Sequence, residues 1–214
     1  HVLEAMRGLE KPPVGVMVTT DKVYENADAG QAFCETDPLG GNDPYSASKA
    51  AMEIAVASWR NSFLRNSQIK VASARAGNVI GGGDWAENRI VPDIARALGA
   101  GRPVDVRNPH AIRPWQHVLV PLAGYLRLAQ HLLTSDSAEF QSAFNFGPEE
   151  ESVRSVQDLV EKAFETWPGT WATQPRRDAP HEAAVLTPTT GKARTTPGHI
   201  STRGLDASVQ ATLQ

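Results

Sequence analysis

The feature that most constrains the fold is a pair of short apolar runs separated by one long amphipathic helix. Residues 14–18 form a continuous apolar run, the pattern of a strand buried on both faces in a parallel sheet, and residues 69–74 form a second buried run. Between them, Asp43 as N-cap and Pro44 at the first helical position predict a helix that continues to about Phe63. Strand, crossover helix and strand is the unit of a parallel α/β sheet, so the chain is predicted to be an α/β protein.

The remainder of the chain predicts shorter elements that form a smaller α/β lobe appended to the sheet. The predicted helices cover residues 1–8, 90–98, 122–133 and 156–167, and the predicted strands lie near residues 104–106, 115–118 and 143–146. The tail from Thr187 onward has weak periodicity, so no structure is predicted for all of it.

Composition and charge exclude several classes of function. The chain has 214 residues, and its 21 Lys and Arg against 24 Asp and Glu give a net charge of -3, which supplies no electrostatic footprint for nucleic acid or an anionic membrane. The single cysteine, Cys34, cannot form an internal disulfide, and no run of about 18 apolar residues would span a bilayer. We therefore expect a cytoplasmic protein without nucleic-acid or membrane partners.

A phenol and an ammonium group begin the stripe of the predicted helix. The residues that share this stripe, at spacings of three and four, are Tyr45, Lys49, Met52, Val56, Trp59 and Phe63. One interpretation makes Tyr45 a core residue and lets Lys49 extend past the edge of the stripe. In the other, the cation one turn from the phenol stabilises the phenolate and prepares Tyr45 to act as a general base. The position of the helix between two parallel strands favours the second interpretation.

Polar residues follow both predicted strands at the edge where ligands bind in open α/β sheets. Thr20, Asp21 and Lys22 follow the first strand, and residues 75–83, which include three successive glycines, follow the second. Glycines at a strand end allow a ligand or another backbone to approach closely. The alternatives are that Thr20 and Asp21 form a cap or turn and that the glycines form a flexible loop.

Residues 107–117 (RNPHAIRPWQH) concentrate two arginines, two histidines and a tryptophan in a chain without a basic excess. Arginine binds phosphate through its bidentate fork, and Trp or His can stack on a base or sugar. The alternative is a polar surface turn with one buried Trp. His110 and His117 have no Cys or carboxylate partners at ligand spacing, so no metal site is predicted.

Taken together, these motifs resemble the extended short-chain dehydrogenase/reductase family of nucleotide-sugar enzymes. The residues that carry the resemblance are 20–22 (TDK), 45–49 (YSASK) and 74–85 (ARAGNVIGGGDW). The Asp-Lys pair, the GGGDW turn and residues 107–117 resemble in particular the CDP-glucose branch of the 4,6-dehydratases in this family. The resemblance covers roughly residues 1–186 and implies a Rossmann-type parallel sheet, bound NAD and a homodimer.

The resemblance also implies a division of the chain. Residues 1–83 would be the C-terminal half of the NAD-binding Rossmann domain, to which a later strand can return. Residues 84–186 would be mainly the lobe that binds the nucleotide sugar, and residues 187–214 a divergent tail.

The implied reaction converts CDP-glucose to CDP-4-keto-6-deoxyglucose. It oxidises C4 by hydride transfer to NAD+, eliminates water across C5 and C6, and returns the hydride to C6. Carried over to this chain, Tyr45 takes the proton from the 4-hydroxyl, Thr20 hydrogen-bonds the same hydroxyl, and Lys49 holds the nicotinamide ribose. Asp21 protonates the departing 6-hydroxyl, which requires a raised pKa. Lys22 removes the C5 proton, where the related dTDP-glucose enzymes commonly have Glu.

The same resemblance assigns binding roles to residues that follow the second strand and beyond. Ala76 and Gly77, with Tyr45 and Lys49, would line the cofactor. The residues implied to grip the nucleotide sugar are Asn78, Arg89, Arg107 and Arg113.

The sequence departs from the family pattern at both ends. It contains no Gly-x-x-Gly-x-x-Gly turn for the pyrophosphate, so we expect an N-terminally truncated sequence that does not turn over by itself. Thr196-Pro197-Gly198-His199 stands where a Leu-Gly-Trp type turn is usual, which removes the expected anchors of the last helix. The alternatives left open are a dehydratase for another nucleotide sugar, a nucleotide-sugar 4-epimerase, and a noncatalytic binding or interaction remnant.

Overall fold

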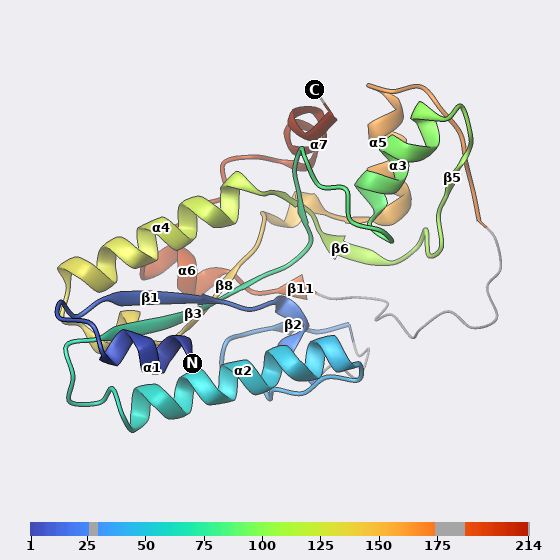
Figure 1. Ribbon diagram of the computed structural model, residues 1–214. Helices are drawn as coiled ribbons and strands as arrows, with labels where there is room; N and C mark the ends of the chain where they lie inside the picture. The colour runs from blue at the N-terminus through green and yellow to red at the C-terminus, as the bar shows by residue number, and fades with distance from the viewer. Residues whose placement is uncertain (26–29, 174–186, 214) are drawn as a thin grey trace.

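The centre of the molecule is a parallel sheet of three strands. The computed structural model describes residues 1–25, 30–173 and 187–213 (Figure 1). The strand order is β1 (Val14–Val18), β3 (Lys70–Ala76) and β8 (Ala143–Phe146), and both pairs are parallel. The predicted strand–helix–strand unit is therefore confirmed, although β3 extends two residues beyond the predicted end.

Helices cover both faces of this sheet, as Figure 1 shows. On one face lie α1 (Val2–Arg7) and α2 (Pro44–Asn61), and on the other lies α4 (Leu119–Thr134). The alternation of side chains along a strand supplies both cores: Val71 packs with the α1 and α2 side chains, and Ala72 packs with Leu128 and Leu132 of α4. Burial on both faces explains why the strand sequences read as continuous apolar runs.

The long helix α2 begins where the sequence predicts and turns a different face inward. The Asp43 carboxylate accepts hydrogen bonds from the backbone N–H groups of Tyr45 and Ser46, with Pro44 in the first turn. The buried residues of α2 are Ser46, Ala50, Glu53 and Val56. Of the predicted stripe Val56 is buried, whereas Tyr45 and Phe63 at its two ends are 51% and 58% exposed, so the interpretation of Tyr45 as a core residue is wrong. Glu53 can lie on the buried face because it has a buried ionic partner, Arg75.

The smaller lobe has a compact apolar core of its own. It is built from the helices α3 (Ile90–Gly99), α5 (Val156–Phe164) and α7 (Leu205–Leu213), with the two-stranded pairs β5 (Val104–Asp105)–β10 (Trp171–Ala172) and β6 (Ile112–Pro114)–β9 (Val153–Ser155). Ile94, Val104 and Val160 are fully buried in it. A capping box between Ser155 and Asp158 starts α5.

The remaining short elements lie beside the sheet or between the two regions. These are the pair β4 (Val79–Ile80)–β7 (Gln116–His117), the pair β2 (Ala32–Phe33)–β11 (Thr187–Pro188), the helix α6 (Gly191–Thr195), and three 3-10 turns at Asp21–Val23, Ala138–Phe140 and Glu150–Ser152. By their contacts, α4 and β8 belong to the sheet. The pairing of β8 with β3 agrees with the expectation that a later strand can return to the sheet, whereas the expectation that α4 lies in the smaller lobe is wrong. Local pattern alone places neither element, because it carries no sign of pairing or packing over long sequence separations.

The tail is more ordered than its weak periodicity predicts. Ala193 of α6 is buried in the sheet core, and Leu205 and Val209 of α7 are buried in the core of the smaller lobe. His199 is buried and packs edge-on against Phe146, with 5.3 Å between ring centroids. The buried His199 side chain therefore anchors the segment before α7 to the sheet through Phe146.

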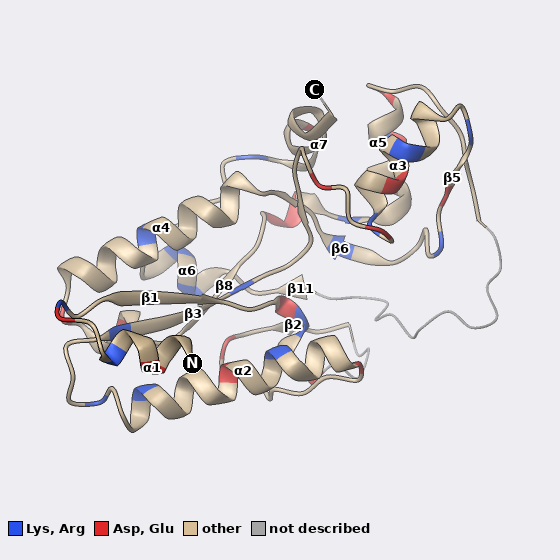
Figure 2. Ribbon diagram, viewed as in Figure 1, with Lys and Arg blue, Asp and Glu red and all other residues tan. Residues whose placement is uncertain are grey.

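In Figure 2, residues of both charges, Lys and Arg as well as Asp and Glu, occur in both regions of the described chain. Within the described ranges, no helix combines the length and the apolar character needed to cross a bilayer. Residues 174–186, which end the predicted smaller lobe, lie outside the described residues. The division of the chain at residues 83 and 186 stays a prediction.

Candidate active site

The first group of the candidate site lies where β1 ends. Thr20 is the N-cap of the 3-10 turn Asp21–Val23: its Oγ1 accepts a hydrogen bond from the Lys22 backbone N–H over 3.4 Å. The same hydroxyl donates to Asp21 Oδ1 over 3.3 Å. Thr20 and Asp21 are both buried. The capping interpretation of Thr20 is thus correct, and it holds the Asp21 carboxyl at the carboxyl end of the strand.

Asp21 is the most perturbed acid of the described site. It is 2% exposed, and its Oδ2 atom has no hydrogen-bond partner among the described residues. Burial raises the pKa of Asp21 from 3.8 to about 7, while the charges of Lys22 and Arg113 and the hydrogen bond from Thr20 act in the opposite direction. A large fraction of this carboxyl is therefore protonated near neutral pH, and its Oδ2 atom is not used in any hydrogen bond among the described residues.

Gly77, directly after β3, packs closely against the Asp21 carboxyl and against Pro114 of β6. A Cβ atom at residue 77 would lie 2.6 Å from Asp21 Oδ2 and 2.7 Å from Pro114 Cγ. Only glycine permits this close approach, because any side chain would displace the carboxyl or the proline. The predicted site residues Asp21, Ala76 and Gly77 are thus brought together where β1 and β3 end.

Tyr45 and Lys49 occupy the first turns of α2. The Tyr45 side chain is half-exposed and Lys49 is partly buried, so the interpretation of Tyr45 as a core residue is wrong. Among the described residues, no hydrogen bond joins the Tyr45 phenol to Lys49 or Thr20.

A Cβ atom on Gly41 would lie 2.5 Å from the Ala47 backbone nitrogen, so this glycine allows the preceding loop to close against the start of α2.

Lys22 lies close to the N-terminus of α2. Its charge contributes to lowering the pKa of Asp43, after the hydrogen bonds from Ser46. It also opposes the rise in the pKa of Asp21. The 3-10 turn that carries Lys22 packs against α2. The Lys22 charge therefore acts on both the Asp21 carboxyl and the cap of the helix that carries Tyr45.

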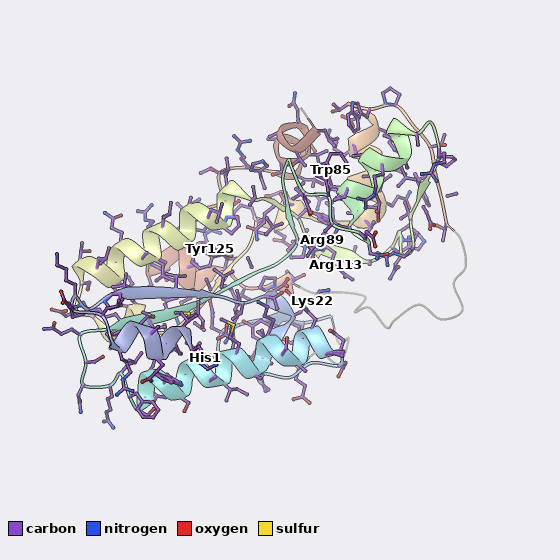
Figure 3. All side chains as sticks on the ribbon, in the orientation of Figure 1. His1, Lys22, Trp85, Arg89, Arg113 and Tyr125 are labelled. Carbon is purple, nitrogen blue, oxygen red and sulfur yellow. The ribbon has the colours of Figure 1, made fainter. Side chains whose placement is uncertain are left out.

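The residues predicted to bind the nucleotide sugar follow the junction between the two regions. In Figure 3, Lys22, Arg113 and Arg89 succeed one another from the end of the sheet toward the smaller lobe. Arg113 is 2% exposed in β6, and its charge acts on Asp21. Arg89 is the N-cap residue of α3, and Arg107 Nη2 donates to the Asn88 carbonyl over 2.9 Å. Asn78 lies in the segment between β3 and β4.

The histidines and tryptophan of residues 107–117 divide between surface and core. Trp115 is 3% exposed and its Nε1 donates to the Arg154 carbonyl, so it supports the lobe as a buried Trp and is unavailable for stacking on a ligand. His110 is exposed, whereas His117 is buried. In the part of the chain that the structure describes, no group of three or more His, Cys, Asp and Glu is placed to hold a metal ion.

Sequence reasoning missed a buried polar network beside the site. Glu53 and Arg75 form an ion pair at 3.0 Å, with side-chain exposures of 2% and 3%. Tyr24 and Asn145 extend the network toward β8. The available signal was Arg75 within the apolar run that forms β3 and Glu53 one turn beyond Lys49 on the predicted helix.

Comparison with known proteins decides the family. The sequence profile of the NAD dependent epimerase/dehydratase family matches residues 1–147, more than half of the chain. The chain belongs to this family. The resemblance of the motifs to extended short-chain dehydrogenase/reductases of nucleotide-sugar metabolism is thereby confirmed, and so is the Rossmann-type α/β fold.

Within the family, the chain is similar to 4,6-dehydratases. It is 42% identical over 193 residues to the CDP-glucose 4,6-dehydratase of Salmonella typhimurium, a match that covers 87% of this chain and 53% of that protein. It is 34% identical over 102 residues to the dTDP-glucose 4,6-dehydratase of Xanthomonas campestris, covering 47% of this chain and 28% of that protein. The chain spans about half the length of the CDP-glucose relative.

Solved structures share the fold across the family. The UDP-glucuronic acid 4-epimerase of Bacillus cereus superposes with a TM-score of 0.81 at 16% identity, covering 99% of this chain and 63% of that chain. The dTDP-glucose 4,6-dehydratase of Bacillus anthracis, solved with NAD, gives a TM-score of 0.77 at 20% identity, with coverage of 100% and 64%. At these identities the likeness shows the fold and leaves the reaction to be argued from the site.

Proposed function

We propose that the protein carrying this chain uses NAD to dehydrate CDP-glucose to CDP-4-keto-6-deoxyglucose. The observation that carries the proposal is Asp21, a buried carboxyl whose pKa is raised to about 7 at the end of β1. An elimination of water needs an acid that is protonated near neutral pH, which an ordinary surface aspartate is not. The similarity to the Salmonella typhimurium enzyme supports CDP-glucose as the nucleotide sugar.

The proposed chemistry divides between two strand ends and one helix. Tyr45 removes the proton of the 4-hydroxyl, Thr20 orients that hydroxyl, and Lys22 takes the C5 proton, which the C4 ketone has made more acidic. Asp21 delivers its proton through the free Oδ2 to the departing 6-hydroxyl. The electrostatic interaction of Lys22 with Asp21 supports an acid and a base that act on neighbouring carbons.

The donor set at the start of α2 fits a nicotinamide dinucleotide. The Tyr45 phenol is half-exposed and the Lys49 ammonium lies one turn away, so both can hydrogen-bond a ribose diol. Tyr45, Lys49, Ala76 and Gly77 are the residues proposed to hold the cofactor. When bound, NAD would accept a hydride from C4 and return it to C6.

The nucleotide sugar is proposed to lie along the junction of the two regions. Asn78, Arg89, Arg107 and Arg113 are the proposed contacts. Arginines suit the diphosphate because the guanidinium fork binds phosphate oxygens in pairs. Residues 84–186 would then supply most of the sugar-nucleotide lobe, with β8 returning to the sheet. Two exposed apolar side chains, Ile54 in the middle of α2 and Phe63 just beyond its C-terminal end, support a homodimer, which light scattering would test.

The decisive experiment supplies the part of the Salmonella typhimurium relative that this chain does not cover. A chimera joining that part to this chain, and the chain alone, are each incubated with NAD and CDP-glucose, and the 4-keto-6-deoxy product is followed by its absorbance in base. Turnover by the chimera is expected, and the chain alone is expected to be inactive. A chimera that folds and converts no CDP-glucose would contradict the proposal.

Two further substrates separate the alternatives. Faster turnover of dTDP-glucose than of CDP-glucose would assign the site to another nucleotide sugar. Interconversion of UDP-glucose and UDP-galactose without dehydration would assign it to a 4-epimerase. Calorimetry of the chimera with NAD and with CDP-glucose tests the noncatalytic alternative, because a remnant that acts only in subunit contacts binds neither.

A further inference from the structure

A buried carboxylate fastens α2 to both strands whose ends form the candidate site. Thr19 Oγ1 on the β1 side donates to Glu53 Oε1 over 2.5 Å. From β3, Ser73 Oγ and Arg75 Nη2 donate to Glu53 Oε2 over 2.7 and 3.0 Å. All four residues are buried. The pKa of Glu53 is lowered despite its burial, because Arg75, Ser73 and Thr19 stabilise the charge together.

The network continues from Arg75 to the third strand. Arg75 Nη1 donates to the Tyr24 hydroxyl over 2.9 Å, and that hydroxyl donates to Asn145 Oδ1 of β8 over 2.6 Å. Asn145 Nδ2 in turn donates to the Phe33 carbonyl of β2 over 3.1 Å. One continuous set of hydrogen bonds therefore connects α2 with β1, β3, β8 and the β2 segment.

This network is not the arrangement that stability alone would favour. Apolar side chains of similar size commonly stabilise a buried site as well as an ion pair does. Moreover, Arg75 Nε is buried without a hydrogen-bond partner in the described parts of the chain. Beyond packing, the network fixes a position: three donors from the ends and interior of two strands determine where the Glu53 carboxylate of α2 lies.

The members of the network are neighbours of the proposed site residues along the chain. Thr19 precedes Thr20, and Arg75 lies two residues before Gly77. Glu53 lies one helical turn beyond Lys49, so a shift of its carboxylate moves the turns that carry Lys49 and Tyr45. We propose that Glu53 is a positioning residue that sets the distance between the Tyr45–Lys49 turns and the strand ends that carry Thr20 and Gly77.

The proposal rests on the proposed function, and the activity of the chimera tests it. Glu53→Gln keeps the size of the side chain and puts an N–H donor among donors, so the three-point contact fails. The expected result is a kcat lower by roughly ten- to a hundredfold with little change in the KM for CDP-glucose. Val56→Ala is the matched control, because Val56 is buried on the same helix outside the network. It should lower the thermal midpoint and leave kcat near the parent value.

A second pair of variants keeps the test decisive where Glu53→Gln does not fold. Thr19→Val preserves shape and removes the hydroxyl that donates to Glu53, whereas Thr19→Ser retains it. We expect kcat to fall in the valine variant and to be recovered in the serine variant at a temperature where both are folded. Equal kcat values for the two, or a loss in Val56→Ala as large as in Glu53→Gln, would overturn the positioning role.

Amide hydrogen exchange on the chain itself separates failure of this proposal from failure of the proposed function. If no form turns over CDP-glucose, the proposed function fails, and the exchange rates still decide the positioning role. Glu53→Gln should accelerate exchange in the Ala47–Lys49 turn of α2 relative to α5, and Val56→Ala should not. Indistinguishable exchange patterns in the two variants would overturn the inference.

Discussion

The sheet region and the smaller lobe bury different kinds of side chain. Beneath the sheet, Glu53, Ser73 and Arg75 meet in hydrogen bonds and an ion pair. In the smaller lobe, the fully buried side chains at the centre are Ile94, Val104, Val106, Leu159 and Val160. Apolar burial is non-directional, whereas a buried charge tolerates only the geometry that pairs it.

This difference indicates where the molecule requires fixed geometry. The directional contacts gather beside the strand ends that carry Thr20, Asp21 and Gly77, where groups must meet at hydrogen-bond distance. The smaller lobe is held by apolar contacts around α3, α5 and α7, which are non-directional and can accept small shifts of its helices. Substitutions in the two regions should therefore have separable effects.

The largest expected effect comes from removing the proposed acid. In the chimera, Asp21→Asn should lower dehydration by roughly a hundred- to ten-thousandfold while hydride transfer from C4 is retained. Product absorbance in base measures the dehydration, and nicotinamide absorbance in a single turnover measures the hydride transfer. Asp136→Asn, at an exposed carboxylate that pairs with Lys70 at the start of β3, is the matched control. Parallel loss of both steps would place Asp21 outside the elimination.

Breaking the buried ion pair should be the most destabilising change. Arg75→Gln leaves the Glu53 carboxylate buried without its cation, which should lower the free energy of unfolding by about 3–5 kcal/mol. The control is Arg194→Gln, which removes an exposed pair with Glu149 and should cost less than about 1 kcal/mol. Urea unfolding measures both. Similar losses of unfolding free energy in the two variants would mean that the buried pair contributes no more to stability than an exposed pair does.

The stability contributed by Asp21 should depend on pH. Because its pKa is raised from 3.8 to about 7 on folding, the folded chain holds this proton more tightly than the unfolded chain. The favourable contribution is complete below about pH 4 and is lost as the pH rises through about 7. Asp21→Asn should therefore stabilise the chain by about 4 kcal/mol at about pH 8 and have little effect at about pH 4. Equal effects of the substitution at both pH values would contradict the raised pKa.

A cavity in the smaller lobe should weaken that region alone. Leu159 is 1% exposed, and Leu159→Ala should lower the free energy of unfolding by about 2–3 kcal/mol. Hydrogen exchange should accelerate in α3, α5 and α7 and remain unchanged in β1 and β3. Acceleration across the sheet to the same extent would show that the two regions unfold as one unit.

The smallest expected effect lies at the start of α2. Asp43→Ala removes the cap that accepts from Tyr45 and Ser46 and should lower the free energy of unfolding by about 1 kcal/mol. Asp43→Ser retains a capping oxygen and should recover most of this loss. Thermal unfolding of the two variants provides the measurement, and an equal midpoint for both would argue against the cap.

Local signals were sufficient for several elements. The strand Val14–Val18 and the helix start at Asp43 and Pro44 were both predictable, because apolar runs and N-caps act over a few residues. The motif residues at the strand ends were likewise found from their order along the chain. The place of β8 beside β3 was not predictable by pattern, since it depends on pairing between residues some seventy positions apart, as in Ser73 with Ala143.

The sequence by itself determined the family, the parallel α/β class and the candidate residues Asp21, Lys22, Tyr45 and Lys49. Only the tertiary structure decided which face of α2 is buried, that Trp115 belongs to the core, and that Glu53 and Arg75 form a buried pair. The physical reason is that a side chain that stays charged in a protein interior needs a partner of opposite charge, which here comes from another segment. That partner is chosen by the fold, so local periodicity carries no sign of it.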